Sequence, residues 1–187
     1  MRLNRVGYNL DQVGSVIRIA GVTKVMTNLN REIEGIQSRT QAGLIKAAAL
    51  IRNETEHGAV KTPVDKGNLR ASWFTVSAGS NIISGGGKTH SPTGQETKFV
   101  GPKAGELASG HASMLMEMRA KAQALSNTYK GPFVIMGYSA NYAMWVHEMI
   151  DANFKRPGAG PKWFEAAVKS QRENIIKVIT ANAKIKK

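Results

Sequence analysis

The side chains in this sequence that could do chemistry do not form a known catalytic motif. The run Gly85-Gly86-Gly87-Lys88-Thr89 is similar to a phosphate-binding loop, in which backbone N–H groups and a lysine hold phosphate. That motif, G-x-x-x-x-G-K-[ST], requires a glycine at position 82, where this chain has isoleucine. Pro92 and Gly94 follow too soon for the helix that such a loop must open. We therefore expect a mobile loop here and no nucleotide site.

Metal and nucleophile chemistry is equally unsupported. The segment His147-Glu148-Met149-Ile150-Asp151 departs from the zinc motif H-E-x-x-H, because its fifth residue is aspartate. Ser72 and Ser139 lack the flanking glycines of a nucleophile elbow. The other three histidines have no metal-ligand spacing: His57, His90 and His111. The sequence therefore predicts a protein that is not an enzyme and that holds no metal and no cofactor.

The charge balance points to polyanionic surroundings. Of the 187 residues, 26 are lysine or arginine and 13 are aspartate or glutamate, which gives a net charge of +13. Such an excess favours phosphate, acidic protein surfaces or anionic lipid as partners. The basic residues are spread along the chain, apart from Lys184, Lys186 and Lys187 near its end. We therefore expect diffuse, non-specific attraction, with an ordinary basic protein as the alternative.

No membrane segment is expected. The sequence has no stretch of 18 or more apolar residues. Asn9, Asp11 and Gln12 interrupt the apolar run that a signal peptide would need. Cysteine is absent, which excludes disulfides and thiolate metal sites and fits an intracellular origin. We expect synthesis in the cytoplasm and no membrane partner.

The elements that position these residues begin with a long helix. From Thr23, a candidate N-cap, apolar side chains recur at steps of three or four residues along one helical face. Gly58 is a candidate for the residue that follows the last turn. The face consists of Met26, Leu29, Ile33, Ile36, Thr40, Leu44, Ala47 and Ile51. The pattern predicts a helix roughly 50 Å long.

A tight turn follows this helix. Pro63 has no N–H and disfavours the helical conformation of Thr62, so the helix must stop before it. Asp65 can bond the backbone two residues on, and Gly67 can take a positive φ at no steric cost. Leu69, Ala71 and Trp73 then alternate with polar residues, which predicts a strand over 71–76. We predict that Pro63, Gly67 and Trp73 determine the fold.

The remaining pattern predicts an α+β core with an insertion. Short strands are expected over 14–20, 81–84, 97–101 and 133–138, and helices over 105–127 and from Pro161 onward. Residues 142–148 are expected to form a helix or a tight turn. The C-terminal helix turns inward Trp163, Phe164, Ala167, Val168, Ile175, Val178 and Ile179. We expect an arm over 1–22, one core domain made of 23–84 and 131–187, and an insertion over 85–130.

Two groups of apolar residues allow alternative interpretations. Trp73, Trp145 and Trp163 form either one aromatic core cluster, which we favour, or anchors of an interface, where tryptophan is enriched. Met116 should face away from Met114 and Met118 on the helix of the insertion. Methionines on both sides would suit an insertion packed between subunits, although a helix with one flank inward is as good an explanation.

Three blocks together resemble a known family. They are Thr62 to Trp73, Tyr138 to Glu148 and Pro161 to Ala167. In this order and spacing they are similar to the tail-completion (neck) proteins of long-tailed double-stranded DNA phages. That family has a Pro-Val-Asp-x-Gly-x-Leu-Arg turn, a Tyr-Ala block ending in Val-(His/Glu)-Glu, and a Pro-x-x-Phe helix start. Lys66 stands where the family has threonine, and the glycine expected after the Val-x-Glu ending is missing.

The resemblance implies a long N-terminal helix, a small antiparallel β-sheet and a C-terminal helix packed on the sheet, with a loop-and-helix insertion. It also implies a ring of identical subunits, often six, at the head–tail junction of the virion, assembled in the host cytoplasm, with DNA passing through the lumen. The implied partners are the chain itself, adjacent connector or adaptor proteins, tail-tube or terminator proteins and, transiently, duplex DNA. Alternatives are a non-specific nucleic-acid-binding module and a minor capsid or tail-tube subunit.

The family has no accepted catalytic residues, so the matched positions are expected to serve the fold and the interfaces. They are Pro63, Asp65, Gly67, Leu69, Arg70, Trp73, Tyr142, Trp145, Glu148, Pro161, Trp163 and Phe164. We expect Arg70 to pair with Asp65 or Glu148 at the base of the sheet. We also expect the loop 85–105 to be ordered by neighbouring proteins.

Overall fold

The computed structural model describes residues 22–78, 82–84 and 98–184, and the chain separates into two compact units, 1–34 and 35–187. The long helix α1 (Val22–His57) crosses the boundary between them. In the first unit, the described part of α1 carries exposed apolar side chains at Val25, Met26, Leu29 and Ile33. The predicted strand over 14–20 and most of the predicted loop over 85–105 lie outside the described residues.

The second unit has the predicted mixture of helices and an antiparallel sheet. After α1, its elements are α2 (Asn68–Ala71), β1 (Trp73–Ser77), β2 (Ile82–Ser84), α3 (Ala104–Thr128), β3 (Val134–Tyr138), α4 (Ala143–Glu148), α5 (Trp163–Ser170) and α6 (Arg172–Ala183). The predicted fold class is therefore confirmed. Among the described residues, no helix is both long and apolar enough to span a membrane.

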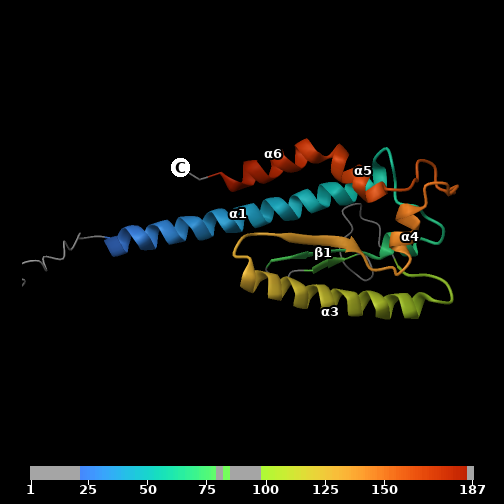
Figure 1. The fold of residues 1–187 in the computed structure, drawn as a ribbon, viewed down its shortest axis with the longest axis horizontal. Coiled ribbons are helices and arrows are strands. Elements are labelled where there is room, and N and C mark those ends of the chain that lie inside the picture. Colours follow the sequence, from blue (N-terminus) through green and yellow to red (C-terminus); the bar gives the residue numbers. More distant parts are fainter. Residues whose placement is uncertain (1–21, 79–81, 85–97, 185–187) are drawn as a thin grey trace, which may run out of the picture. The chain divides into compact units, whose positions relative to one another are not determined.

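The sheet is antiparallel in the order β2-β1-β3. All five residues of β1 are buried, because helices cover both of its faces. Figure 1 shows α3 on one side of the sheet and the C-terminal part of α1 on the other. Phe74 and Val76 pack with Ala122 of α3, whereas Trp73 lies under the guanidinium of Arg52 from α1, 5.0 Å from the ring centre. The central strand thus joins two packed layers.

Helix α3 belongs to this packing although it lies within the predicted insertion. Met114 and Met118 contact the cluster of Phe74 and Val76. Met116 points outward and is 74% exposed, as its helical spacing predicts. The other side of the sheet is tied to α1 by Gln41, whose amide accepts from the N–H of Phe133 and donates to its carbonyl.

The predicted strand over 71–76 starts later than expected. Gly67 adopts the predicted left-handed conformation, with φ of 91°, and it leads into the short helix α2. The Ser72 hydroxyl donates to the Leu69 carbonyl and closes this turn. The alternation from Leu69 to Trp73 therefore reflects one helical turn followed by a strand that begins at Trp73.

Three further predictions were wrong. Residues 98–101 form no strand, because the side chain of Asn68 bonds both the N–H and the carbonyl of Val100, at 2.7 and 3.0 Å. The C-terminal helix is two helices that meet at Gln171. Pro161 does not occupy the first helical position of α5, since Lys162, with φ of 55°, lies between Pro161 and Trp163.

The left-handed turn gives a first stability prediction. A Cβ at Gly67 would meet open space, so Gly67→Ala should cost ~1–2 kcal/mol of unfolding free energy through its positive φ alone. Gly105→Ala on α3 is a matched control, because its Cβ also meets open space but its backbone is helical. It should leave stability unchanged or raise it by up to ~1 kcal/mol. Urea unfolding of both variants measures the difference, and equal values would refute the argument.

Candidate functional site

The three sequence blocks Thr62 to Trp73, Tyr138 to Glu148 and Pro161 to Ala167 come together in the folded chain. Leu69 from the turn, Ala140 and Ala143 from the second block, and Trp163 from the third form one buried cluster. Tyr138, Tyr142, Val146 and Phe164 pack around it. Blocks separated by up to about a hundred residues therefore build a single structural centre.

Trp163 lies at the middle of this centre. It is 1% exposed, and its ring meets the rings of Tyr138 and His147 edge-on, with centroids 5.9 and 4.8 Å apart. Phe164 makes a similar contact with Tyr138 at 6.3 Å. Edge-on aromatic pairs are favourable beyond the area they bury, so Trp163 joins β3, α4 and α5.

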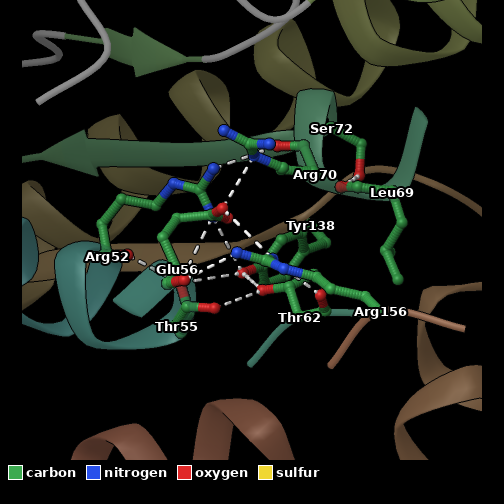
Figure 2. A network of polar contacts seen from close by, with 9 residues as sticks. All are labelled: Arg52, Thr55, Glu56, Thr62, Leu69, Arg70, Ser72, Tyr138 and Arg156. Atoms are coloured by element: carbon green, nitrogen blue, oxygen red, sulfur yellow. Dashed lines mark hydrogen bonds and ion pairs between the residues drawn. The ribbon is translucent and has the colours of Figure 1, made fainter. Parts of the chain in front are cut away.

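A buried charge cluster lies next to this centre, and it corrects the prediction for Arg70. Figure 2 shows three arginines converging on Glu56, whose side chain is 3% exposed. Its carboxylate is 2.7 Å from Arg52, 2.7 Å from Arg70 and 3.4 Å from Arg156. Arg70 thus pairs with neither Asp65 nor Glu148. The helix α1 ends against the turn, so Glu56 is nearer to Arg70 than either predicted carboxylate.

Hydroxyl and carbonyl groups complete the cluster. Arg52 donates to the Tyr138 hydroxyl at 3.3 Å, and Arg156 donates to the carbonyls of Glu56 and Thr62. The Thr62 hydroxyl donates to the Thr55 carbonyl. Because Arg156 comes from the loop between α4 and α5, these bonds fix that loop against the end of α1 (Figure 2). We interpret the cluster as structural: it holds the loop between α4 and α5 against the end of α1.

Sequence reasoning missed this cluster. Ala48, Arg52 and Glu56 are all buried and follow one another at steps of four. Arg52 and Glu56 continue the helical face of Ala48 at a spacing that allows an ion pair, and this spacing could have predicted the buried pair.

An exposed apolar surface corrects the prediction for Trp145. Trp73 and Trp163 are buried, but Trp145 is 74% exposed and belongs to no core cluster. The short helix α4 turns Ala143 inward, so side chains on its other flank face outward. The surface, which we call the α4 patch, consists of Met144, Trp145, Met149 and Ile150.

A cavity of about 390 Å³ lies beside the turn that follows α1. Five of the predicted residues line it: Pro63, Asp65, Gly67, Leu69 and Tyr142. Asp65 pairs at 3.3 Å with Lys155, and both side chains are largely exposed at the cavity. Burial, together with the negative charge of Asp65, raises the pKa of the Tyr142 phenol, which therefore stays neutral.

Glu148 serves the connection between α4 and α5. Its carboxylate is bonded to Lys162 and, at 2.8 Å, to His147, and these bonds hold the pKa of Glu148 below its usual range. The N–H of Lys162 donates to the His147 carbonyl. Pro161, half-buried, precedes this contact. Glu148 and the His147 carbonyl thus hold Lys162 at the start of α5.

One side-chain pair has the elements of nucleophile chemistry. His111 of α3 is buried, and its Nδ1 lies 2.5 Å from the Ser139 hydroxyl. A serine nucleophile needs a base that a third group orients. The Nε2 of His111 finds no hydrogen-bond partner among the described residues. We therefore interpret the pair as a tie between α3 and the end of β3. Within the described ranges, no three potential metal ligands gather.

This tie predicts a pH dependence of stability. Burial lowers the pKa of His111, so the folded protein binds this proton more weakly than the unfolded chain does. Its contribution to stability is complete above the ordinary histidine pKa of about 6.5 and is lost as pH falls below it. The unfolding free energy should fall more between pH 7 and pH 5.5 in the parent than in His111→Gln. His57→Gln, which removes an exposed imidazole, is the control; equal slopes in the parent and His111→Gln would contradict the prediction.

Comparison with protein-family models, with curated proteins and with solved structures found no match.

Proposed function

We propose that the protein is a structural subunit of a tailed-phage virion that forms a homo-oligomeric ring at the head–tail junction. The observation that carries the proposal is the convergence of the three family-like blocks on one centre, with Trp145 of the second block left exposed. In a catalytic site, the converging residues would surround the side chains that react with a substrate. Among the described residues, the blocks enclose aromatic packing, ion pairs and the hydrogen bond of Ser139 to His111, and they leave Met144 and Trp145 exposed. An exposed apolar surface of this kind is typical of a contact with a neighbouring protein.

The charge of the chain supports the same proposal. Duplex DNA carries about one negative charge per 1.7 Å, and a subunit with a net charge of +13 is attracted to it without any base-reading element. Exposed lysines are spread over α3, α6 and the loops. Spread charge gives weak, non-specific contact, which permits DNA to pass through a lumen.

The proposal is tested by assembly and by function in the virion. Purified protein should form closed rings in negative-stain images and a single large species by mass photometry. A phage that lacks this protein should accumulate filled heads and separate tails, and the purified protein should restore infectious particles. Particles that mature normally without the protein would refute the proposal. Restoration with the subunit located in the capsid or tail tube would instead favour the minor capsid or tail-tube alternative.

A free-standing nucleic-acid-binding module is the second candidate, favoured by the net charge of +13. It predicts that an isolated subunit binds duplex DNA with an affinity that falls steeply with salt, because binding releases counterions. The ring proposal predicts little binding by the isolated subunit and more by the assembled form. Titration of labelled duplex at two salt concentrations separates the two.

A further inference from the structure

We propose that the α4 patch of one copy of this chain docks into the cavity beside the 63–69 turn of a second copy. This inference rests on the proposed function, because it names the contact through which the subunits of the ring would join. The α4 patch and the cavity are complementary in apolar character and in charge, and both belong to the same chain.

The α4 patch has the composition of an interface anchor. Four large apolar side chains lie within seven residues, and three of them are more than 70% exposed: Met144, Trp145 and Ile150. Tryptophan dominates the binding energy of many interfaces, and methionine adapts to an irregular pocket. Leaving such a group in water is unfavourable, at about 25 cal/mol for each Å² of apolar surface.

The cavity offers the matching surface. Its apolar lining includes Val64, Leu69, Tyr142, Val146 and Phe154, and its polar lining includes Lys66 and Lys155. A volume of about 390 Å³ lies within the range that compact apolar ligands fill. The ion pair between Asp65 and Lys155 lies at the cavity and is open to water, where an indole N–H could find an acceptor.

Charge selects a second copy as the occupant. Two copies of a chain with a net charge of +13 repel each other, so their contact needs a surface where the sign is reversed. Residues 143–151 contain Glu148 and Asp151 but no lysine or arginine. The cavity carries Lys66 and Lys155 against Asp65. Because Glu148 is bonded to Lys162 and Asp65 is paired with Lys155, the charge complementarity rests on Asp151 beside the α4 patch and Lys66 in the cavity lining.

The contact joins two different surfaces, so one copy can touch two neighbours. Each copy would give its α4 patch to one neighbour and receive a patch from another. A contact between two different surfaces is heterologous, and it closes into a ring when the rotation between copies permits. A two-fold pair in which each patch fills the cavity of the other copy would stop at a dimer, so parent species larger than a dimer distinguish the ring from it.

Two single variants and their mixture test the contact. Trp145→Ala removes the anchor, and Asn153→Trp places a large side chain in the cavity from an exposed position in its lining. Each variant alone should associate roughly thirtyfold or more weakly than the parent. Mixed, they retain one intact patch and one intact cavity, so they should form one-to-one dimers and nothing larger. Mass photometry and light scattering measure the species.

Matched controls separate docking from folding. Met116→Ala removes a side chain that is as exposed as Trp145, 74% in each case, but lies on α3; it should leave assembly unchanged. Circular dichroism should show all variants folded. Lys66→Glu reverses a charge in the cavity lining and should weaken association, whereas Lys121→Glu on α3 should not. Acrylamide should quench Trp145 in the dilute parent and less in the assembled parent.

The outcomes are distinguishable from those that test the proposed function. If Trp145→Ala forms the same rings as the parent, this contact is refuted while the ring proposal stands. If both variants fail to associate and their mixture gives no dimer, the α4 patch of a second copy does not fill the cavity, and the contact is refuted. A different virion protein or a small amphipathic ligand then fills the cavity. A parent protein that remains monomeric at every concentration contradicts this contact and the self-assembled ring together.

Discussion

Replacing Glu56 by glutamine should lower the free energy of unfolding by about 3–5 kcal/mol, the largest charge effect that we expect in this molecule. The carboxylate is 3% exposed and lies within 3.4 Å of Arg52, Arg70 and Arg156. Without its charge, three guanidinium groups remain close together and repel one another in a poorly solvated place. Urea unfolding followed by circular dichroism measures the loss.

A suppressor makes this prediction specific to charge. In the Glu56→Gln background, Arg70→Met should recover part of the lost stability, because it removes one of the three repelling cations while keeping apolar bulk. Glu165→Gln is the control. It breaks the exposed pair with Lys169, which water screens, so stability should barely change. A Glu56→Gln protein as stable as the Glu165→Gln protein would show that the charge cluster around Glu56 does not stabilise the fold.

Trp163→Ala should cost about 3–5 kcal/mol, the usual range for truncating a buried tryptophan. Trp163 packs with Leu69 and Ala143 and meets the rings of Tyr138 and His147. Its removal leaves a void at the point where all three sequence blocks meet. We expect a large drop in melting temperature without any change that depends on protein concentration.

Trp145→Ala gives the opposite result and serves as the control. The same substitution at an exposed position should leave the unfolding free energy of the monomer nearly unchanged. If the α4 patch docks as proposed, only the concentration-dependent part of stability is lost. Equal destabilisation by the two tryptophan variants at high dilution would show that Trp145 is part of the core.

Much of the fold was predictable because the helices are amphipathic and well delimited. Steps of three and four residues predicted α1, and similar apolar spacing predicted α3 to within two residues at each end. Residues 142–148 were expected to be a helix or a tight turn, and α4 is the helix. Pro63 and Gly67 predicted the turn, since each acts through its own backbone conformation. These signals are local, and no distant contact overrides them.

The candidate site was less predictable because it depends on distant neighbours. Arg70 needs a carboxylate, but only the packing of α1 against the turn selects Glu56 over Asp65. Asn68 captures the backbone of Val100 across thirty-two residues and prevents a strand there. Trp145 and Trp163 are alike in sequence terms, and the orientation of a six-residue helix decides which one is exposed.

Helix α6 is packed less tightly on the second unit than the other long helices of that unit are. None of its side chains, all of which the structure describes, is buried, and its contact with α1 is close at Gly43, where a Cβ would lie 3.1 Å from the Ile179 Cα. Segments with little buried surface open at low free energy while the core remains closed. Amide hydrogens of α6 should therefore exchange with solvent well before those of β1, because α6 unfolds locally while the sheet remains folded.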